Sequence, residues 1–359
     1  MNPTSSPTDT DIFAWRCIMW LIVLVNSIAW FRVAYKIIRT YTPTPWISII
    51  LSEAYVIGCT YRAVYPVMDT LRISTVDHFL NSVFAGRCIA TVAELSFVAQ
   101  IALILNKLSH DVKLHSAYAA SLILVPLIVC AEIASWYGVI TLNNFGHVIE
   151  EFLWKTSAGM LITVFLLCLC KVHLSEITGI ARSNLQSTVL SGLTSNVCEF
   201  IDIVSAPVFV CGEYRCLMQF INGEINSRTV PDMTKINQIF FYTGLSMCYL
   251  IIMFRSMYVF YPNYRSKIKS SVFLMIFLCS VWCYHIYMEL IDIPMYYKRW
   301  LDDQAHNKTY LSITDGFHDV RTNWTVSTSY DVWSSEIPWM TLYFSLGPLC
   351  STMLLWYFY

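Results

Sequence analysis

The chain has 359 residues and a formal net charge of −1; 56% of its residues are hydrophobic and only 13% are charged. A soluble domain carries about 25% charged residues, because its surface must be hydrated. The composition therefore excludes an ordinary soluble fold. It predicts an all-α integral membrane protein, in which the lipid bilayer solvates the apolar surface. The near-neutral charge gives no basic surface for a nucleic-acid partner.

Long apolar segments predict the membrane-spanning helices, since about 20 apolar residues cross the hydrocarbon core. Eight such segments follow one another: 12–36, 46–66, 79–107, 115–141, 147–172, 236–257, 270–294 and 338–359. A ninth segment, 188–211, is less apolar because it carries Glu199 and Asp202. The sequence therefore predicts a single integral membrane domain over residues 1–359, a polytopic transmembrane bundle of eight or nine helices.

The charges of the connecting segments predict how the helices are oriented. Lys and Arg collect in cytoplasmic loops, and with nine helices every basic connection falls on one side, including residues 255–269. With eight helices that connection falls on the opposite side. Nine helices are therefore preferred, with the N-terminus exoplasmic and the C-terminus cytoplasmic. Residues 298–337 then form an exoplasmic loop, which could fold over the bundle as a lid. Which cellular membrane holds the protein does not follow from these charges.

Two N-x-S/T sequons lie in that loop, at Asn307 and Asn323. Such sequons are glycosylated only on the lumenal or extracellular side of a membrane. Both asparagines are therefore candidates for glycosylation if the source is eukaryotic. Their position agrees with the orientation that the loop charges predict.

Ionisable side chains inside the predicted helices are the candidate functional residues, since each costs roughly 2.5–3.5 kcal/mol at the bilayer centre. Most converge on the predicted exoplasmic half, where Glu150 and Lys155 also lie. Arg87 and Glu94 are seven residues apart, so they share a helix face, with Glu94 near the midplane. We expect a polar pocket that opens outward, with Glu94 at its floor. Its candidate residues are Arg62, Arg87, Glu94, Glu132, Glu151, His285, Glu289 and Asp292.

A possible metal or proton site follows from the spacing of His285, Glu289 and Asp292, which share one helical face. His147 and Glu151, also four residues apart, would complete a metal site if the two helices are neighbours. The same stripe could instead be a hydrogen-bonded structural feature. Likewise, Arg62 and Arg87 could form structural ion pairs or bind an anionic substrate. The sequence identifies no cofactor.

Two runs that contain proline and aromatic residues flank the predicted loop, at 292–300 and 336–344. Pro294 is expected to end or kink a helix, and Pro338 fits a first helical turn. The aromatic side chains, Trp333 included, are typical of membrane-interface anchors.

These runs, D-x-P-M-Y-x-x-R-W and E-x-P-W-M-x-x-Y-F, together with residues 86–95 (GRCIATVAEL), resemble a family of uncharacterised multi-pass membrane proteins. The resemblance implies the multi-pass architecture. It implies no activity.

Three functions remain open. The first is a transporter-like protein that binds a small polar solute or protons in the outward-facing pocket. The second is an intramembrane enzyme that uses His285, Glu289 and Asp292. The third is a non-catalytic receptor or assembly factor, in which the buried charges only hold the helices together.

Overall fold

The structure is a computed structural model that describes residues 10–184, 292–333 and 336–359, together with Val281, Tyr284 and Met288. The chain divides into two compact units. The first comprises residues 1–104, 128–150 and 303–359, and the second comprises 105–127 and 151–302.

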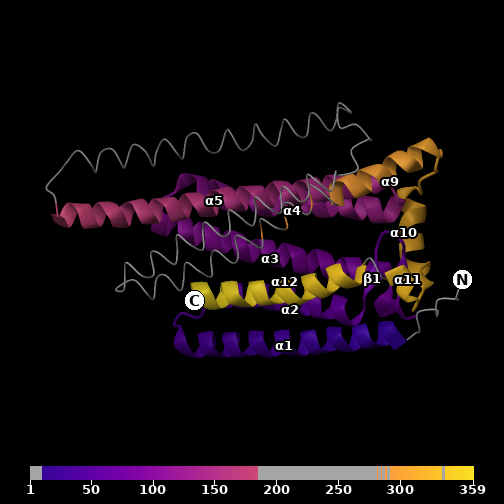
Figure 1. The fold of residues 1–359 in the computed structure, drawn as a ribbon, viewed down its shortest axis with the longest axis horizontal. Coiled ribbons are helices and arrows are strands. Elements are labelled where there is room, and N and C mark those ends of the chain that lie inside the picture. Colours follow the sequence, from indigo (N-terminus) through magenta and orange to yellow (C-terminus); the bar gives the residue numbers. More distant parts are fainter. Residues whose placement is uncertain (1–9, 185–280, 282–283, 285–287, 289–291, 334–335) are drawn as a thin grey trace, which may run out of the picture. The chain divides into compact units, whose positions relative to one another are not determined.

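Most of the described residues are helical (Figure 1). The long helices are α1 (Thr10–Thr40), α2 (Trp46–Val64), α3 (Val83–Val112), α4 (His115–Thr141), α5 (Asn144–Asn184) and α12 (Glu336–Phe358). Within the described residues, α1 to α4 each contain a stretch long and apolar enough to cross a membrane, and α12 contains a shorter apolar stretch, Met340–Trp356. The protein is therefore an integral membrane protein. The segments predicted at 188–211 and 236–257, and nearly all of 270–294, lie outside the described residues, so the helix total stays a prediction.

In the first unit, α1, α2 and α12 pack against one another. The buried core between them includes Trp15 of α1, Tyr55 of α2 and Phe344 of α12. Elsewhere on α1, Phe13 and Leu21 are 70% and 60% exposed. A helix with one buried face and one exposed apolar face fits a bundle whose outer surface contacts lipid.

Helices α2 and α3 approach each other closely at Gly58. A Cβ atom at this position would overlap the Cβ of Ala93 and contact the Ile89 carbonyl oxygen at 3.4 Å. Small residues permit such close backbone approach between membrane helices. Gly58 therefore sets the distance between these two helices.

Two segments of the first unit, residues 65–82 and 303–333, lie together at one end of its helices; we call them the cap. The cap contains a small sheet in the order β1-β2-β3, with β1 and β2 antiparallel and β2 and β3 parallel. Its elements are β1 (Val67–Met68), β2 (Ile73–Ser74), η1 (Phe79–Asn81), the end of α9 (Ile293–Ala305), α10 (Ile313–Thr322), β3 (Thr325–Val326) and α11 (Tyr330–Trp333). The all-α prediction missed this sheet because strands of two residues carry no alternating pattern.

Arg72 connects the cap to the end of α4. This buried side chain donates hydrogen bonds to the carbonyl oxygens of Val139 (3.1 Å) and Ile140 (3.3 Å) and forms an ion pair with Asp319 of α10. Gly316 of α10 packs against the same Ile140 carbonyl, where a Cβ atom would clash. The part of the predicted loop 298–337 that belongs to the cap is therefore folded onto the helix ends.

Two details of the predicted loop differ from expectation. Trp333, which was expected to be a membrane anchor, is fully buried. Its ring packs against that of Trp15, with 5.9 Å between the ring centroids, and its indole N–H donates a hydrogen bond to the Ser327 carbonyl (2.7 Å). The anchor interpretation was wrong because folding of the cap encloses this side chain. The predicted loop also does not begin at residue 298, because α9 continues to Ala305. Pro294, which was expected to end or kink a helix, lies in the first turn of α9. Pro338 does lie in the first turn of α12, as predicted.

In the second unit, α3 passes into α4 through a tight turn. The Leu114 amide donates to the Ser109 carbonyl (3.0 Å), and Lys113 adopts a positive φ of 55°. The rings of His110 and Tyr118 lie 6.1 Å apart across the turn. These contacts fix the reversal between the two helices.

Replacing Gly58 by valine should lower the stability of the protein, because the added side chain would overlap Ala93 and force α2 and α3 apart. Overpacking of this kind costs about 1–3 kcal/mol, which would appear as a lower Tm of the purified protein in detergent. Ile57→Val is the control, since Ile57 is 57% exposed. Equal melting temperatures for the two variants would contradict the close approach.

Candidate intramembrane carboxylate centre

Helices α4 and α5 are held close together where α5 begins. A Cβ atom on Gly146 would lie only 2.6 Å from the Ala134 carbonyl oxygen and from the Gly138 amide nitrogen. This contact between glycines brings the backbones together. It sets the first turns of α5, with His147 and Glu150, beside the part of α4 that carries Glu132.

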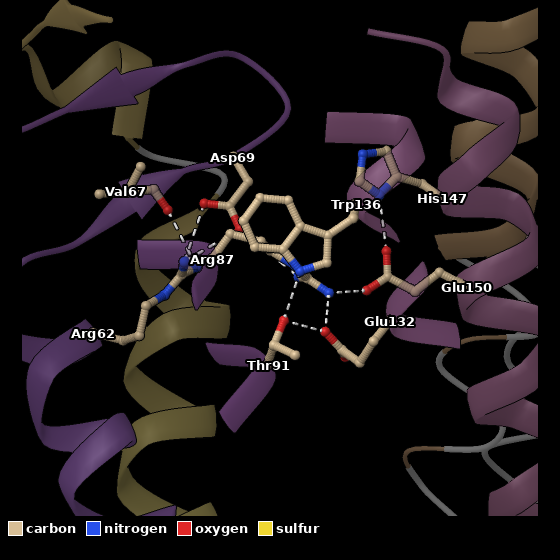
Figure 2. Close-up of polar contacts among 9 residues, drawn as sticks. All are labelled: Arg62, Val67, Asp69, Arg87, Thr91, Glu132, Trp136, His147 and Glu150. Atoms are coloured by element: carbon tan, nitrogen blue, oxygen red, sulfur yellow. Dashed lines mark hydrogen bonds and ion pairs between the residues drawn. The ribbon is translucent and has the colours of Figure 1, made fainter. Parts of the chain in front are cut away.

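Arg87 of α3 joins these two helices. Its Nη2 atom donates hydrogen bonds to Glu132 Oε2 (3.0 Å) and to Glu150 Oε1 (2.9 Å). All three side chains are buried, with exposed fractions of 7%, 3% and 6%. Figure 2 shows the guanidinium between the two carboxylates. The Arg87 guanidinium therefore connects α3, α4 and α5.

Neighbouring side chains also contact each carboxylate. The Thr91 hydroxyl donates to Glu132 Oε2 (2.6 Å) and accepts a hydrogen bond from Trp136 Nε1 (3.0 Å). His147 Nδ1 lies 2.9 Å from Glu150 Oε2. Hydrogen bonds to charged acceptors of this kind are the stronger ones in proteins, so the positions of both carboxylates are well defined.

A second arginine lies on the cap side of this network. Arg62 Nη1 donates to both carboxylate oxygens of Asp69, at 3.1 and 3.2 Å, and Nη2 donates to the Val67 carbonyl at 3.5 Å. Asp69 also lies 3.9 Å from Arg87 Nη1. The absence of a side chain at Gly86 leaves room for Arg62, whose Nη1 would lie 3.1 Å from a Cβ there. Asp69 therefore links the two arginines (Figure 2).

Glu94 completes a cluster of three carboxylates. One ligand oxygen of each of Glu94, Glu132 and Glu150 lies within 4.8 Å of the others. We call these three residues the carboxylate centre. Glu132 Oε1 is buried and has no hydrogen-bond donor among the described residues when all three are ionised. A protonated Glu94 would supply that donor, because a carboxylic acid carries one O–H.

The charges of this network do not balance when every acid and base is ionised. Four carboxylates, those of Asp69 and of the carboxylate centre, face two guanidiniums, those of Arg62 and Arg87. A protonated His147 would still leave one negative charge in excess. An uncompensated charge in a low-dielectric environment is strongly disfavoured and is usually removed by proton uptake. The geometry thus suits the binding of a proton or another cation.

Four of the predicted pocket residues come together here: Arg62, Arg87, Glu94 and Glu132. Glu151 follows Glu150 by one residue, so the two positions are about 100° apart around the axis of α5. Glu151 and Asp292 belong to the second unit. His285 and Glu289 lie outside the described residues. His147 contacts Glu150. The metal site that combines His147, Glu151, His285 and Glu289 stays a prediction, as does a water-filled pocket.

The pocket prediction omitted Glu150 and Asp69. Glu150 has the same predicted depth as Glu151, so depth alone gave no reason to prefer it. The separation of three residues between His147 and Glu150 was a usable signal, because it places both on one helix face. Asp69 lies between two predicted helices and was interpreted only as a loop charge.

Replacing Arg87 by methionine should destabilise the protein by about 3–5 kcal/mol, because Glu132 and Glu150 would be left as unpaired buried charges. Adding Glu150→Gln to that variant should recover part of the loss, since it restores the original charge imbalance. The Tm in detergent measures both effects, with the exposed Arg32→Met as a control. A double variant less stable than Arg87→Met alone would contradict the charge explanation.

The chain matches no protein family, no curated protein and no solved structure in the comparisons made. The resemblance of residues 86–95, 292–300 and 336–344 to a multi-pass family stays a prediction. Inferences about function therefore depend on the residues of the carboxylate centre and on the membrane around them.

Proposed function

We propose that the protein is a transporter-like membrane protein that binds and releases protons at the carboxylate centre, either as its substrate or together with a small polar solute. The supporting observation is the convergence of Glu94, Glu132 and Glu150 within 4.8 Å, although Arg87 pairs with only two of them. Ionisable groups at membrane depth typically line ion pathways and proton relays.

The proton is the ligand that fits these contacts best. Arg87 already engages one oxygen of Glu132 and one of Glu150, and His147 lies beside the second oxygen of Glu150. Few carboxylate oxygens remain for the six or more ligands that Ca²⁺ or Mg²⁺ usually takes. A single proton between Glu94 and Glu132 needs only two oxygens and removes one negative charge.

A second candidate is a receptor or assembly factor in which the network only holds helices together. It is favoured by the short contacts of Arg87 with α4 and α5. That function needs no excess of carboxylates, whereas proton binding does. The enzyme alternative depends on His285 and Glu289, outside the described residues.

We further propose that the cap is exoplasmic. The exposed Lys36 and Arg39 lie near the other end of α1, and basic residues favour the cytoplasmic side. Asn144 at the start of α5 donates a hydrogen bond to Asp303 (2.8 Å), so the segment between them begins and ends at the cap. Such a segment crosses the membrane an even number of times, which favours the prediction of nine helices over eight.

Glu94→Gln should abolish proton movement, because an amide cannot take up and release the proton. The purified protein in liposomes, with a pH-sensitive dye inside and an imposed pH gradient, gives the rate. Glu53→Gln is the matched control, since Glu53 is another half-buried carboxylate within a membrane span, on α2. Equal rates for wild type, Glu94→Gln and empty liposomes would reject proton transport.

The orientation predicts which lysines are accessible from outside the cell. An impermeant amine-reactive reagent should label Lys308 of the cap in intact cells, while Lys36 should react only after lysis; both lysines are exposed. In a eukaryotic host, glycosidase treatment should also shift the protein's mobility, and Asn307→Gln with Asn323→Gln should remove that shift. Labelling of Lys36 from outside would reverse the proposed orientation.

A further inference from the structure

A row of polar side chains follows one face of α2 from the cap end to the opposite end of the helix. Ser48, Ser52, Tyr55, Cys59 and Arg62 recur at alternating intervals of four and three residues, which places them on one helical face. All except Arg62 are buried. At 1.5 Å per residue the row is about 21 Å long, much of the thickness of a hydrocarbon core.

The part of the row nearest the carboxylate centre is a group of hydroxyl and thiol side chains. Tyr55 and Cys59 lie in one buried cluster, against which Tyr343 of α12 packs. The same cluster includes Ala93, the residue before Glu94 on α3, and the ring of Phe97, one turn further along α3, stacks on Tyr55 with 4.4 Å between the ring centroids. Gly347 makes room for this arrangement, because a Cβ there would lie 2.5 Å from the Tyr55 hydroxyl.

The row continues toward the other end of the helices through two further hydrogen-bonded groups. Ser52 and Ser351 share a hydrogen bond of 2.9 Å between their hydroxyls, and the Ser351 hydroxyl donates to Gln100 Oε1 at 2.7 Å. Gln100 Nε2 in turn donates to the Ser351 carbonyl at 3.0 Å. At the end of the row, Ser48 donates to the Tyr359 hydroxyl at 3.0 Å.

We propose that this row is the path by which protons pass between the carboxylate centre and the end of the helices opposite the cap. The inference depends on the proposed function. Each hydroxyl accepts a proton on one side and releases its own proton on the other, so no other reactant is consumed. Successive positions of the row are about 4.5 to 6 Å apart along the axis of α2, an interval of the size that one bridging water molecule spans.

Structural hydrogen bonds alone do not explain the alignment of these groups. Ser, Thr and Gln side chains do join membrane helices to one another, but such contacts need not lie in line or lead to a charged site. Here the three groups occupy successive turns of the same face of α2, and the first group adjoins Glu94. A continuous series of groups that both donate and accept is what proton conduction requires.

The test compares two substitutions of nearly equal volume at Ser351, the residue that joins Ser52 to Gln100. Ser351→Thr keeps a hydroxyl, whereas Ser351→Val removes it. Proton flux into liposomes should fall at least about tenfold in Ser351→Val relative to Ser351→Thr. Ser345→Ala is a control on the same helix: its hydroxyl donates to the Thr341 carbonyl one turn back, so flux should not change.

A second readout separates this inference from the proposed function. The infrared carbonyl band of a protonated carboxylic acid reports proton binding at the carboxylate centre, and it should persist in Ser351→Val. Equal flux for the valine and threonine variants would overturn the path. Loss of both flux and band in the valine variant would also overturn it, since Ser351 would then support the site itself. Absence of flux in the wild type would instead reject the proposed function, and the path with it.

Discussion

The structure depends on one buried cation, the guanidinium of Arg87. It donates hydrogen bonds to Glu132 on α4 and to Glu150 on α5, and so joins three helices. Removing one partner of a buried ion pair leaves an uncompensated charge, which is much worse than removing both. Replacing the arginine or one of its partners alone is therefore expected to cost stability.

The arginine stabilises some of the negative charge but not all of it. Asp69 is shared with Arg62, so the second arginine does not neutralise the carboxylate centre. The remaining charge falls on Glu94 and Glu132, and the buried Oε1 of Glu132 has no hydrogen-bond donor among the described residues. A purely structural network would have no reason to keep this third acid. In the proposed function, Glu94 is the residue that changes a helix-joining ion pair into a proton-binding site.

The cap and the glycine contacts explain how the polar residues are held. Arg72 binds the cap to the end of α4, and β1 and β2 hold the turn that carries Asp69. The contact between Gly138 and Gly146 brings α5 against α4. Backbone packing therefore determines the position of the network, and the ion pairs determine its charge. This separation of roles is why stability and proton binding can be tested independently.

Part of this site could be predicted from sequence and part could not. Helical spacing placed Arg87 and Glu94 on one face, and the predicted helix positions placed Arg62 and Glu132 in the exoplasmic half. The same reasoning could not choose between Glu150 and Glu151. The two positions differ by a rotation of about 100° around α5, and the sequence does not specify which neighbouring helix each position faces. Trp333 was misread for a similar reason, since its burial results from a cap assembled from distant segments.

The most direct test of the account is whether a carboxylic acid stays protonated inside the membrane domain. The infrared spectrum of the purified protein at neutral pH gives the answer, because a protonated carboxyl and a carboxylate absorb at different frequencies. The account predicts a protonated carboxyl band in the wild type that is lost in Glu94→Gln and retained in Glu53→Gln. A spectrum without this band, in a protein that is folded, would mean that the carboxylate centre holds no proton and would contradict the account.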